Sequence, residues 1–337
     1  SYVENVARTI AEVMDSYKVI VEKSKVPVET GEKVAKAIKI YNTHKVGFNV
    51  VSNPEFLREG SAINDFMHPD RIVIGCESDK AKRIMEGLYE PLKAPIIFTD
   101  IKSAEIIKHA SNSFLATKIS FINAIANICE LAGADVEKVA EGIGLDKRIG
   151  RAFLNAGIGY GGFCFPKDAE AFIKISEKLG YDFKLLKAAQ EINQQQRNHF
   201  VKKIEKALWI VKGKTIGILG LAFKPNTDDI RFAPSIDIIT ELQKEGAKIK
   251  AYDPKAMEKA KQVLKDIVYC DSPYDVAEDS DALVIITEWG EFKELDLKRI
   301  KSLMKNPLII DGRNIYAHEE IRRGGFTYIS IGRKEVI

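Results

Sequence analysis

The chain has 337 residues, of which 45% are hydrophobic and 29% are charged. This length predicts two or three domains, and the hydrophobic share is sufficient for large cores. Lys and Arg total 51 against 48 Asp and Glu, so the net charge of +3 is too small to indicate binding to nucleic acid or to a membrane. We find no apolar run that would span a bilayer and no signal-peptide pattern, which predicts a cytoplasmic protein.

The N-terminal part of the sequence alternates between helices and short apolar strands. Apolar residues at helical spacing predict helices over residues 1–14, 30–40 and 79–89. Runs rich in Val and Ile predict strands over residues 18–21, 46–51, 70–75 and 96–98. Such alternation is typical of an α/β unit.

A long amphipathic helix is predicted next, over residues 103–132, because apolar residues recur along it at helical spacing. At 1.5 Å per residue it would be a rod of about 45 Å, which suits a connection between domains or a subunit interface. Lys108 and Asn112 share one face of this helix. Helices over 135–143 and 182–208 follow, so the central region is predicted to be all-helical.

The C-terminal part alternates again and predicts a parallel doubly wound sheet. The predicted strands cover residues 215–219, 249–252, 282–286, 308–310 and 328–330, and the predicted helices cover residues 235–245, 255–264 and 297–303. The fold class is therefore α/β, with two Rossmann-like doubly wound units joined by the central helical region. The first turn of the second unit, at residues 217–224, is not GxGxxG, so a second dinucleotide site is not expected, although Asp253 follows the next strand.

The stretch from Gly157 to Asp168 has the composition of a reactive site. Four glycines within six residues allow the backbone to approach a ligand closely, and Cys164, Lys167 and Asp168 follow. A cysteine beside a lysine, near the start of a predicted helix, is in a setting typical of reactive thiols. The alternative interpretation is a glycine-rich loop with a buried, inert cysteine.

The other cysteines are predicted to be structural thiols because they lie at or beside apolar segments. They are Cys76, Cys129 and Cys270. No CxxC pair and no histidine spacing indicates zinc, so no metal site is predicted. The five histidines lack a recognisable cysteine-hydrolase motif, which makes a thiol hydrolase the least favoured function.

Two charged loops are further candidates for a binding site. Glu55, Arg58 and Glu59 follow the predicted strand at 46–51, and open α/β sheets bind ligands at the carboxyl ends of their strands. An acidic loop at residues 223–231 precedes a predicted helix in the C-terminal part. A solvated surface turn is the alternative interpretation for both loops.

Five segments carry a family resemblance. In chain order they are EKSxVPV at 22–28, NPEFLREG at 53–60, the lysine and asparagine at 108 and 112, GxGGxCxPKD at 159–168, and FKPNTDDxR at 223–231. With these segments the whole chain resembles the UDP-glucose/GDP-mannose dehydrogenase family, and within it the UDP-glucose 6-dehydrogenases. Five positions depart from the family pattern. Lys25 stands where threonine is usual, and Phe163 stands where a small residue is usual. The others are Glu29 in place of glycine, His109 in place of a small or aliphatic residue, and Phe232 in place of glutamate.

The resemblance implies roles for individual residues. The implied catalytic residues are Cys164, Lys108, Asn112, Asp168 and Glu55. The implied cofactor-binding residues are Ser24, Lys25, Val26, Glu59, Lys167 and Arg231. The implied substrate-binding residues are Phe56, Leu57, Arg58, Arg148, Asn155, Gly159, Tyr160, Gly161, Lys224 and Arg313. His109, beside the implied catalytic lysine, is interpreted as a packing residue.

The resemblance also implies a reaction, which is the NAD-dependent oxidation of UDP-glucose to UDP-glucuronate in two steps. Covalent capture of the aldehyde by Cys164 would give a thiohemiacetal and then a thioester. Arg148 matches a family arginine that reaches the nucleotide across a dimer interface, which implies a homodimer. Another nucleotide sugar, such as UDP-N-acetylmannosamine, is the alternative substrate.

The family's GxGYxG loop has no counterpart in the sequence. The resemblance therefore implies that residues 1–98 are the C-terminal half of a truncated NAD-binding domain. Residues 99–208 would be a central dimerisation region with the catalytic loop, and 209–337 a Rossmann-like UDP-sugar-binding domain. On this interpretation the chain is a fragment that binds UDP-sugar and dimerises, and it is expected not to reduce NAD.

Overall fold

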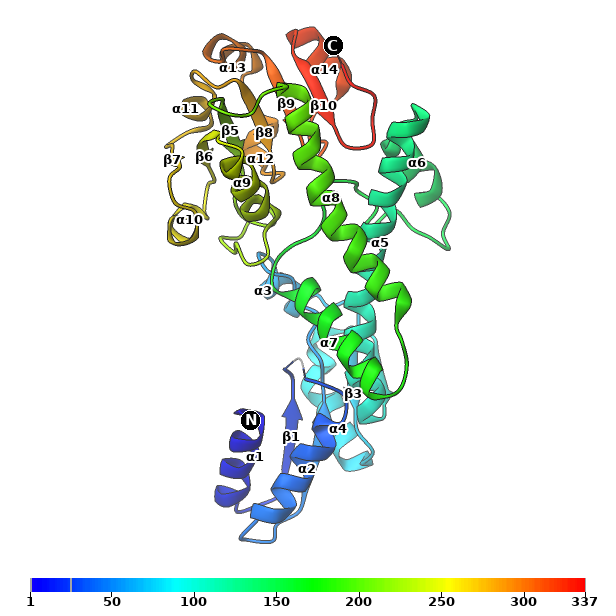
Figure 1. The fold of residues 1–337 in the computed structure, drawn as a ribbon. Helices are drawn as coiled ribbons and strands as arrows, with labels where there is room; N and C mark the ends of the chain where they lie inside the picture. Colours follow the sequence, from blue (N-terminus) through cyan, green and yellow to red (C-terminus); the bar gives the residue numbers. More distant parts are fainter. Residues whose placement is uncertain (1, 25, 337) are drawn as a thin grey trace. The chain divides into compact units, whose positions relative to one another are not determined.

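The structure is a computed structural model that describes residues 2–24 and 26–336 (Figure 1). The chain divides into two compact units. Unit 1 is built from residues 1–112 and 171–182, and unit 2 from residues 113–170 and 183–337. Two helices, α5 (Ile101–Ala132) and α7 (Cys164–Lys178), contribute residues to both units.

Unit 1 contains a four-stranded sheet with the order β1-β2-β3-β4. Its strands are β1 (Lys18–Glu22), β2 (Phe48–Ser52), β3 (Ile72–Gly75) and β4 (Ile96–Thr99). β1 pairs with β2, and β3 with β4, in parallel. β2 and β3 run antiparallel and meet where Ser52 faces Gly75. All four predicted strands are present, and the sheet differs from a purely parallel one at this central pair.

Helices cover both faces of the sheet in unit 1. Side chains alternate between the faces of a strand. Val50 belongs to a core cluster with α1 (Tyr2–Val13) and α2 (Thr30–Tyr41), while its neighbour Val51 packs in a cluster with α4 (Asp79–Tyr89). The unit therefore has the layered order expected of an α/β fold. Two short helices that the sequence patterns did not predict complete it, α3 (Ala62–Met67) and η1 (Glu90–Leu92).

Unit 2 contains a six-stranded sheet in which every pair is parallel, with the order β10-β9-β8-β5-β6-β7. Its strands are β5 (Thr215–Leu219), β6 (Lys248–Tyr252), β7 (Val268–Tyr269), β8 (Ala282–Ile285), β9 (Leu308–Asp311) and β10 (Thr327–Ser330). The chain first builds β5, β6 and β7 outward and then returns to build β8, β9 and β10 on the other side. This is the doubly wound order, and it confirms the predicted fold class.

The helices of unit 2 include long ones that the sequence patterns predicted and short ones that they did not. They are α6 (Val136–Gly144), α8 (Lys184–Leu208), α9 (Pro234–Lys244), α10 (Met257–Val263), α11 (Pro273–Ala277), α12 (Gly290–Lys293), α13 (Leu297–Leu303) and α14 (His318–Gly324). α11, α12 and α14 were not predicted. α11 and α12 have five and four residues, which is too short for hydrophobic periodicity to show.

Contrary to the sequence prediction, helix α5 is long and apolar enough to cross a membrane by length and composition alone. Part of this helix forms polar contacts with another helix of the protein. Ser120 Oγ donates a hydrogen bond to the carbonyl oxygen of Ala189, and Asn127 Nδ2 donates to Gln196 Oε1 at 3.1 Å. Both partners lie on α8, so polar contacts join the two long helices within unit 2.

Glu130 forms a larger polar network at the C-terminal end of α5. Its carboxylate is 2.8 Å from His199 Nε2 and 2.6 Å from Lys203 Nζ, both on α8, and it accepts a hydrogen bond from the Gly332 N–H at 2.8 Å. Burial alone would raise the pKa of Glu130, but these donors outweigh burial and lower its pKa to about 2. The carboxylate thus stabilises the packing of α5, α8 and the C-terminal segment.

Glu130→Gln is expected to destabilise unit 2 at neutral pH by up to about 3 kcal/mol. Because the pKa is lowered from 4.5 on folding, the extra stability is present above pH 4.5 and is lost as the pH falls towards 2. Urea unfolding should therefore show a smaller difference in the free energy of unfolding between wild type and variant at pH 3 than at pH 7. Glu141→Gln is the control, since its pair with Lys138 is exposed. Equal unfolding curves for Glu130→Gln and the control would contradict the assignment.

Candidate functional site

The site residues of unit 1 lie on α5 and on the loops that follow β1 and β2. Glu105, a buried residue of α5, accepts hydrogen bonds from the backbone N–H groups of Glu29 at 2.8 Å and Gly31 at 2.9 Å. Burial raises the pKa of Glu105, and these two N–H groups oppose that effect. A Cβ at Gly31 would lie 2.5 Å from Ile101 Cγ2, so α2 begins in close contact with α5. Lys25 lies outside the described residues.

His109 has the contacts of a packing residue, as the sequence analysis interpreted it. The ring is buried and stacks on Phe172 with the ring centroids 5.6 Å apart. Its Nε2 is 3.0 Å from the carbonyl oxygen of Val26. The histidine thereby connects α5 to the segment that carries Ser24 and Val26.

Asn53 holds the loop that follows β2. Its Nδ2 donates to the carbonyl oxygen of Val73 at 2.8 Å, and its Oδ1 accepts from Lys23 Nζ at 3.0 Å. The phenol of Tyr89 hydrogen bonds to the same Oδ1. Because all these partners come from neighbouring strands and α4, the first residues of the NPEFLREG loop have a defined position.

Glu55 and Lys108 come together in unit 1. Lys108 Nζ is 3.6 Å from Glu55 Oε1, and the lysine side chain is only 7% exposed. The carboxylate also accepts a hydrogen bond from the Leu57 N–H at 2.7 Å, which fixes its orientation. Lys108 Nζ lies 5.2 Å from the centroid of the Phe56 ring. Asn112 is buried one turn further along α5, so the structure groups three of the five predicted catalytic residues.

Arg58 and Glu59 occupy the exposed part of the same loop. The guanidinium of Arg58 forms an ion pair with Asp65 of α3 at 2.5 Å, and the Arg58 N–H donates to the same carboxylate at 2.9 Å. Asp65 therefore has a pKa well below its usual range. The pair stiffens the loop, while Glu59 at its tip faces solvent.

In unit 2, polar residues of α8 form hydrogen bonds with the backbone of the glycine loop. Asn193 accepts from the Tyr160 N–H at 2.7 Å and donates back to the Tyr160 carbonyl oxygen at 3.1 Å. Gln196 donates to the Gly157 carbonyl oxygen at 2.9 Å, and Arg197 donates to that of Tyr160 at 2.8 Å. These three α8 residues were missed by the sequence analysis. The signal was the polar run from Asn193 to Arg197 inside an otherwise amphipathic helix.

The glycines in this loop are required by close contacts. A Cβ at Gly161 would lie 2.4 Å from the backbone oxygen of Phe232, and one at Gly159 would lie 2.6 Å from Asn193 Oδ1. Gly159 also has a φ of 94°, which favours glycine. The loop therefore passes between α8 and the C-terminal part of unit 2, with no room for a side chain at Gly159 or Gly161.

Arg313 connects the glycine loop to the C-terminal sheet. Its guanidinium donates to the carbonyl oxygens of Gly159 at 3.1 Å and Ile286 at 2.8 Å, and it pairs with Glu288 at 3.2 Å. The predicted substrate-binding residues Gly159, Tyr160 and Arg313 thus belong to one hydrogen-bonded assembly, and Gly161 packs closely beside it. Asn155, just before it, accepts from Arg151 at 2.7 Å.

Cys164 is the first residue of α7 and is exposed. Asp168 lies one turn further along the helix and is buried. The other cysteines are buried free thiols, and burial raises the pKa of each. Cys164 is therefore the accessible thiol of the described chain, as the sequence analysis expected. Of the predicted catalytic residues, Glu55, Lys108 and Asn112 therefore belong to unit 1, and Cys164 and Asp168 belong to unit 2.

Two further cations lie beside the cysteine in unit 2. Lys167 Nζ is 4.4 Å from the centroid of the Phe163 ring, and Arg231 Cζ is 4.3 Å from it. Arg231 also forms a two-point contact with Asp229, at 2.9 and 2.8 Å. Lys224 of the same loop lies over the ring of Phe223 at 5.5 Å.

Arg148 lies apart from these contacts within the chain. Its side chain is 89% exposed and pairs with Asp146 at 2.6 Å. The neighbouring backbone is held by Lys118 of α5, which donates to the carbonyl oxygens of Ile149 at 3.1 Å and Gly150 at 3.2 Å. Arg148 is thus presented at the surface of unit 2.

Asp253 fills the turn that follows β5. One carboxylate oxygen accepts from the N–H groups of Leu221 at 2.7 Å and Ala222 at 2.9 Å, and from the Trp289 indole N–H at 3.1 Å. In a dinucleotide site the N–H groups of this turn contact a pyrophosphate. Here they are bound to a carboxylate of the protein itself.

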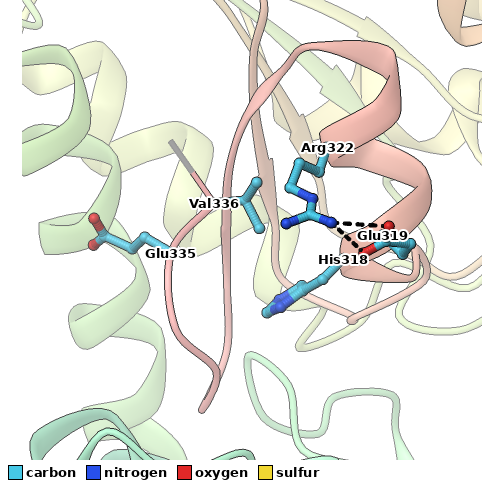
Figure 2. A pocket seen from close by; sticks show the side chains of 5 residues that line it. All are labelled: His318, Glu319, Arg322, Glu335 and Val336. Atoms are coloured by element: carbon cyan, nitrogen blue, oxygen red, sulfur yellow. Dashed lines mark hydrogen bonds and ion pairs between the residues drawn. The ribbon is translucent and has the colours of Figure 1, made fainter.

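A pocket in unit 2 lies away from all these residues, and Figure 2 shows its lining side chains. They are His318, Glu319, Arg322, Glu335 and Val336. Arg322 points towards Glu319 and donates to both of its carboxylate oxygens, at 2.9 and 3.0 Å. Burial and the nearby Arg333 lower the pKa of His318. None of the predicted site residues lines this pocket.

Comparison with family models matches nearly the whole chain to one family. Residues 1–93 match the NAD binding domain of the UDP-glucose/GDP-mannose dehydrogenase family, residues 102–195 its central domain, and residues 217–318 its UDP binding domain. The prediction that the chain lacks the N-terminal part of the NAD-binding domain is not supported, because residues 1–93 match that domain's model.

Individual relatives agree with the family match. The chain is 54% identical to UDP-glucose 6-dehydrogenase TuaD of Bacillus subtilis, over 100% of this chain and 73% of the relative. It is 47% identical to UDP-glucose 6-dehydrogenase of Rhizobium meliloti, over 99% and 78%. Among solved structures, a UDP-glucose dehydrogenase from Pyrobaculum islandicum has a TM-score of 0.90 at 38% identity, over 99% of this chain and 76% of that one.

Proposed function

The chain belongs to the UDP-glucose/GDP-mannose dehydrogenase family, and we propose from this premise that it oxidises UDP-glucose to UDP-glucuronate with NAD. The observation that carries the proposal is Cys164. It is exposed at the start of α7, and the glycine loop before it is held by α8. A thiol in this position can capture an aldehyde, which is what a two-step oxidation of an alcohol to an acid needs.

The residues present fit NAD as the cofactor. Lys167 and Arg231 both contact the ring of Phe163, which brings together two cations of the kind that bind a diphosphate. Ser24, Val26 and the exposed Glu59 follow strands at the carboxyl ends where α/β sheets bind nucleotides. When bound, NAD accepts the hydride that leaves C6 of the sugar. Lys25 belongs to the same proposed set.

The protein's own residues then act on the sugar carbon. The Cys164 thiol adds to the aldehyde and forms a thiohemiacetal. The hydride on its carbon would pass to a second NAD, the hydroxyl proton would pass to a carboxylate of the site, and a thioester would remain. Water hydrolyses the thioester and releases the acid and the thiol. Lys108 and Asn112 stabilise the negative charge on the substrate oxygen, for which a buried ammonium and a buried amide are suited. Asp168 and Glu55 hold the protons and the attacking water.

The uridine nucleotide is assigned to the other predicted substrate-binding residues. Gly159 and Arg313 share a hydrogen bond of 3.1 Å, so loop and arginine are already positioned. Lys224 supplies a further cation in the loop at 223–231. Phe56, Leu57 and Arg58 belong to the NPEFLREG loop, while Asn155, Tyr160 and Gly161 belong to the glycine loop.

The test of the function uses protein expressed from the full coding sequence, incubated with NAD and UDP-glucose. NADH absorbance should appear, with two NADH formed for each UDP-glucuronate. UDP-N-acetylmannosamine in place of UDP-glucose should give a much lower kcat/KM. No NADH from UDP-glucose, with the protein folded, would refute the proposal. A higher kcat/KM for the acetylated sugar would favour the alternative substrate.

We further propose that the protein is a homodimer through α5. Three large apolar residues are exposed at intervals of seven along this helix. They are Phe114, Phe121 and Ile128, which are 66%, 51% and 58% exposed. Residues at this spacing form one stripe along a helix, and exposed apolar stripes mark protein interfaces. Arg148, at the surface of the same unit, is assigned to the partner's nucleotide.

Phe121→Asp is expected to convert the dimer to a monomer, because a charge would be buried in the interface without a partner. Light scattering after size-exclusion chromatography measures the mass directly. The control is Phe66→Asp, since Phe66 is also exposed, at 42%, but lies on α3 in unit 1. A wild-type mass of one chain, or an unchanged dimer in Phe121→Asp, would exclude this interface.

The predicted organisation completes the proposal. Residues 1–98 are assigned to the NAD-binding domain, 99–208 to the central region and 209–337 to the UDP-sugar-binding domain. The family matches at 1–93, 102–195 and 217–318 support this order. A cytoplasmic location is proposed because the substrates are soluble nucleotides.

A further inference from the structure

Phe163 departs from the small residue that is usual in the resembled family, and it contacts two cations. Lys167 Nζ and Arg231 Cζ lie 4.4 and 4.3 Å from the centroid of its ring. The two charges are therefore less than 9 Å apart. The Phe163 side chain is 37% exposed, so ring and cations are accessible from solvent.

The contact has a physical consequence for the cations. Both side chains are flexible and lose rotamer freedom when a ligand fixes them, and the paired Asp229 carboxylate offsets part of the charge of Arg231. The negative face of an aromatic ring attracts both and reduces this cost in advance. Arg231 is held further by the Asp229 carboxylate, to which its Nε donates at 2.9 and 3.1 Å and its Nη2 at 2.8 Å. A small residue at position 163 would remove the surface that Lys167 and Arg231 share.

We propose that Phe163 is a positioning residue that preforms Lys167 and Arg231 as a clamp for a diphosphate group. Two cations that contact one ring suit a ligand with negative charge on two adjacent phosphates. The inference rests on the proposed function, in which both nucleotides, NAD and UDP-glucose, carry one diphosphate. Phe163 acts through the cations and not on the reacting carbon.

The test is titration calorimetry of the purified protein with NAD alone and with UDP alone. Phe163→Leu keeps the apolar bulk but removes the aromatic face. It should weaken the affinity for one of the two nucleotides about 5- to 20-fold and leave the affinity for the other unchanged. The nucleotide whose affinity falls is the one whose diphosphate the clamp binds. Phe163→Tyr keeps the face and should restore the affinity. Phe153→Leu is the matched control, because Phe153 is 38% exposed but contacts the ring of Phe165.

A double-mutant cycle tests whether Phe163 acts through Lys167. In a Lys167→Met background, Phe163→Leu should have little further effect on nucleotide affinity. Unchanged affinities for both nucleotides in Phe163→Leu would overturn the proposal. An equal loss with and without Lys167, or a loss for both nucleotides together with a lowered melting temperature, would also overturn it. Protein that binds both nucleotides but forms no NADH would refute the proposed function and leave the clamp intact.

Discussion

Cys164→Ser is expected to abolish the formation of UDP-glucuronate, with a loss on the order of 10³-fold or more in kcat. A serine hydroxyl is not ionised at neutral pH and is a much weaker nucleophile than a thiolate, so the aldehyde would not be captured. Binding of UDP-glucose should remain close to that of the wild type, because Cys164 is exposed and the glycine loop is held by α8. Production of the acid, measured by chromatography, and calorimetry with UDP-glucose together check both expectations.

The control for this substitution is Cys270→Ser. Cys270 is buried, so its substitution is expected to lower the melting temperature without changing the kcat of the folded fraction. Acid production by Cys164→Ser at the wild-type rate would exclude the covalent mechanism. An aldehyde released by this variant in place of the acid would support it directly.

Lys108→Met is expected to lower kcat about 10²- to 10³-fold, because the ammonium that stabilises the substrate oxyanion is lost. Methionine preserves the unbranched stem, so the packing of the side chain near Phe56 is retained. Glu55 would lose its ion pair at 3.6 Å, but its side chain is 25% exposed and water can replace the lysine. Steady-state kinetics should show the loss mainly in kcat, with KM for UDP-glucose changed little.

Lys102→Met is the matched control on the same helix. Lys102 pairs with Glu32 at 2.9 Å, but both side chains are more than half exposed, so the substitution should leave kcat near the wild-type value. A Lys108→Met variant with wild-type kcat would remove Lys108 from the catalytic set. A rise in KM alone would place the lysine in substrate binding instead.

The regular elements and the reactive loop were predictable from the sequence because their signals are local. The predicted strands at 215–219 and 282–286 are apolar runs bounded by polar or turn residues, and α5 has periodic apolar positions over its length. The exposed Cys164 was likewise indicated by the glycines before it and the lysine after it. Hydrophobic periodicity, turn residues and motif spacing are each defined by residues that are close together in the chain, so they can be recognised in a single sequence.

The tertiary structure alone decided which polar residues hold the site. The sequence predicted the helix over 182–208 but no partners for Asn193, Gln196 and Arg197. In the structure these residues form hydrogen bonds with the glycine loop, about 35 residues earlier in the chain. Asp253 similarly contacts N–H groups in the turn after β5. Such contacts depend on which segments pack together. Local sequence patterns therefore determined the helices, the strands and the reactive motif. Packing between distant segments determined the hydrogen-bond partners of the site residues, because a hydrogen bond requires proximity in space and leaves no periodic pattern in the sequence.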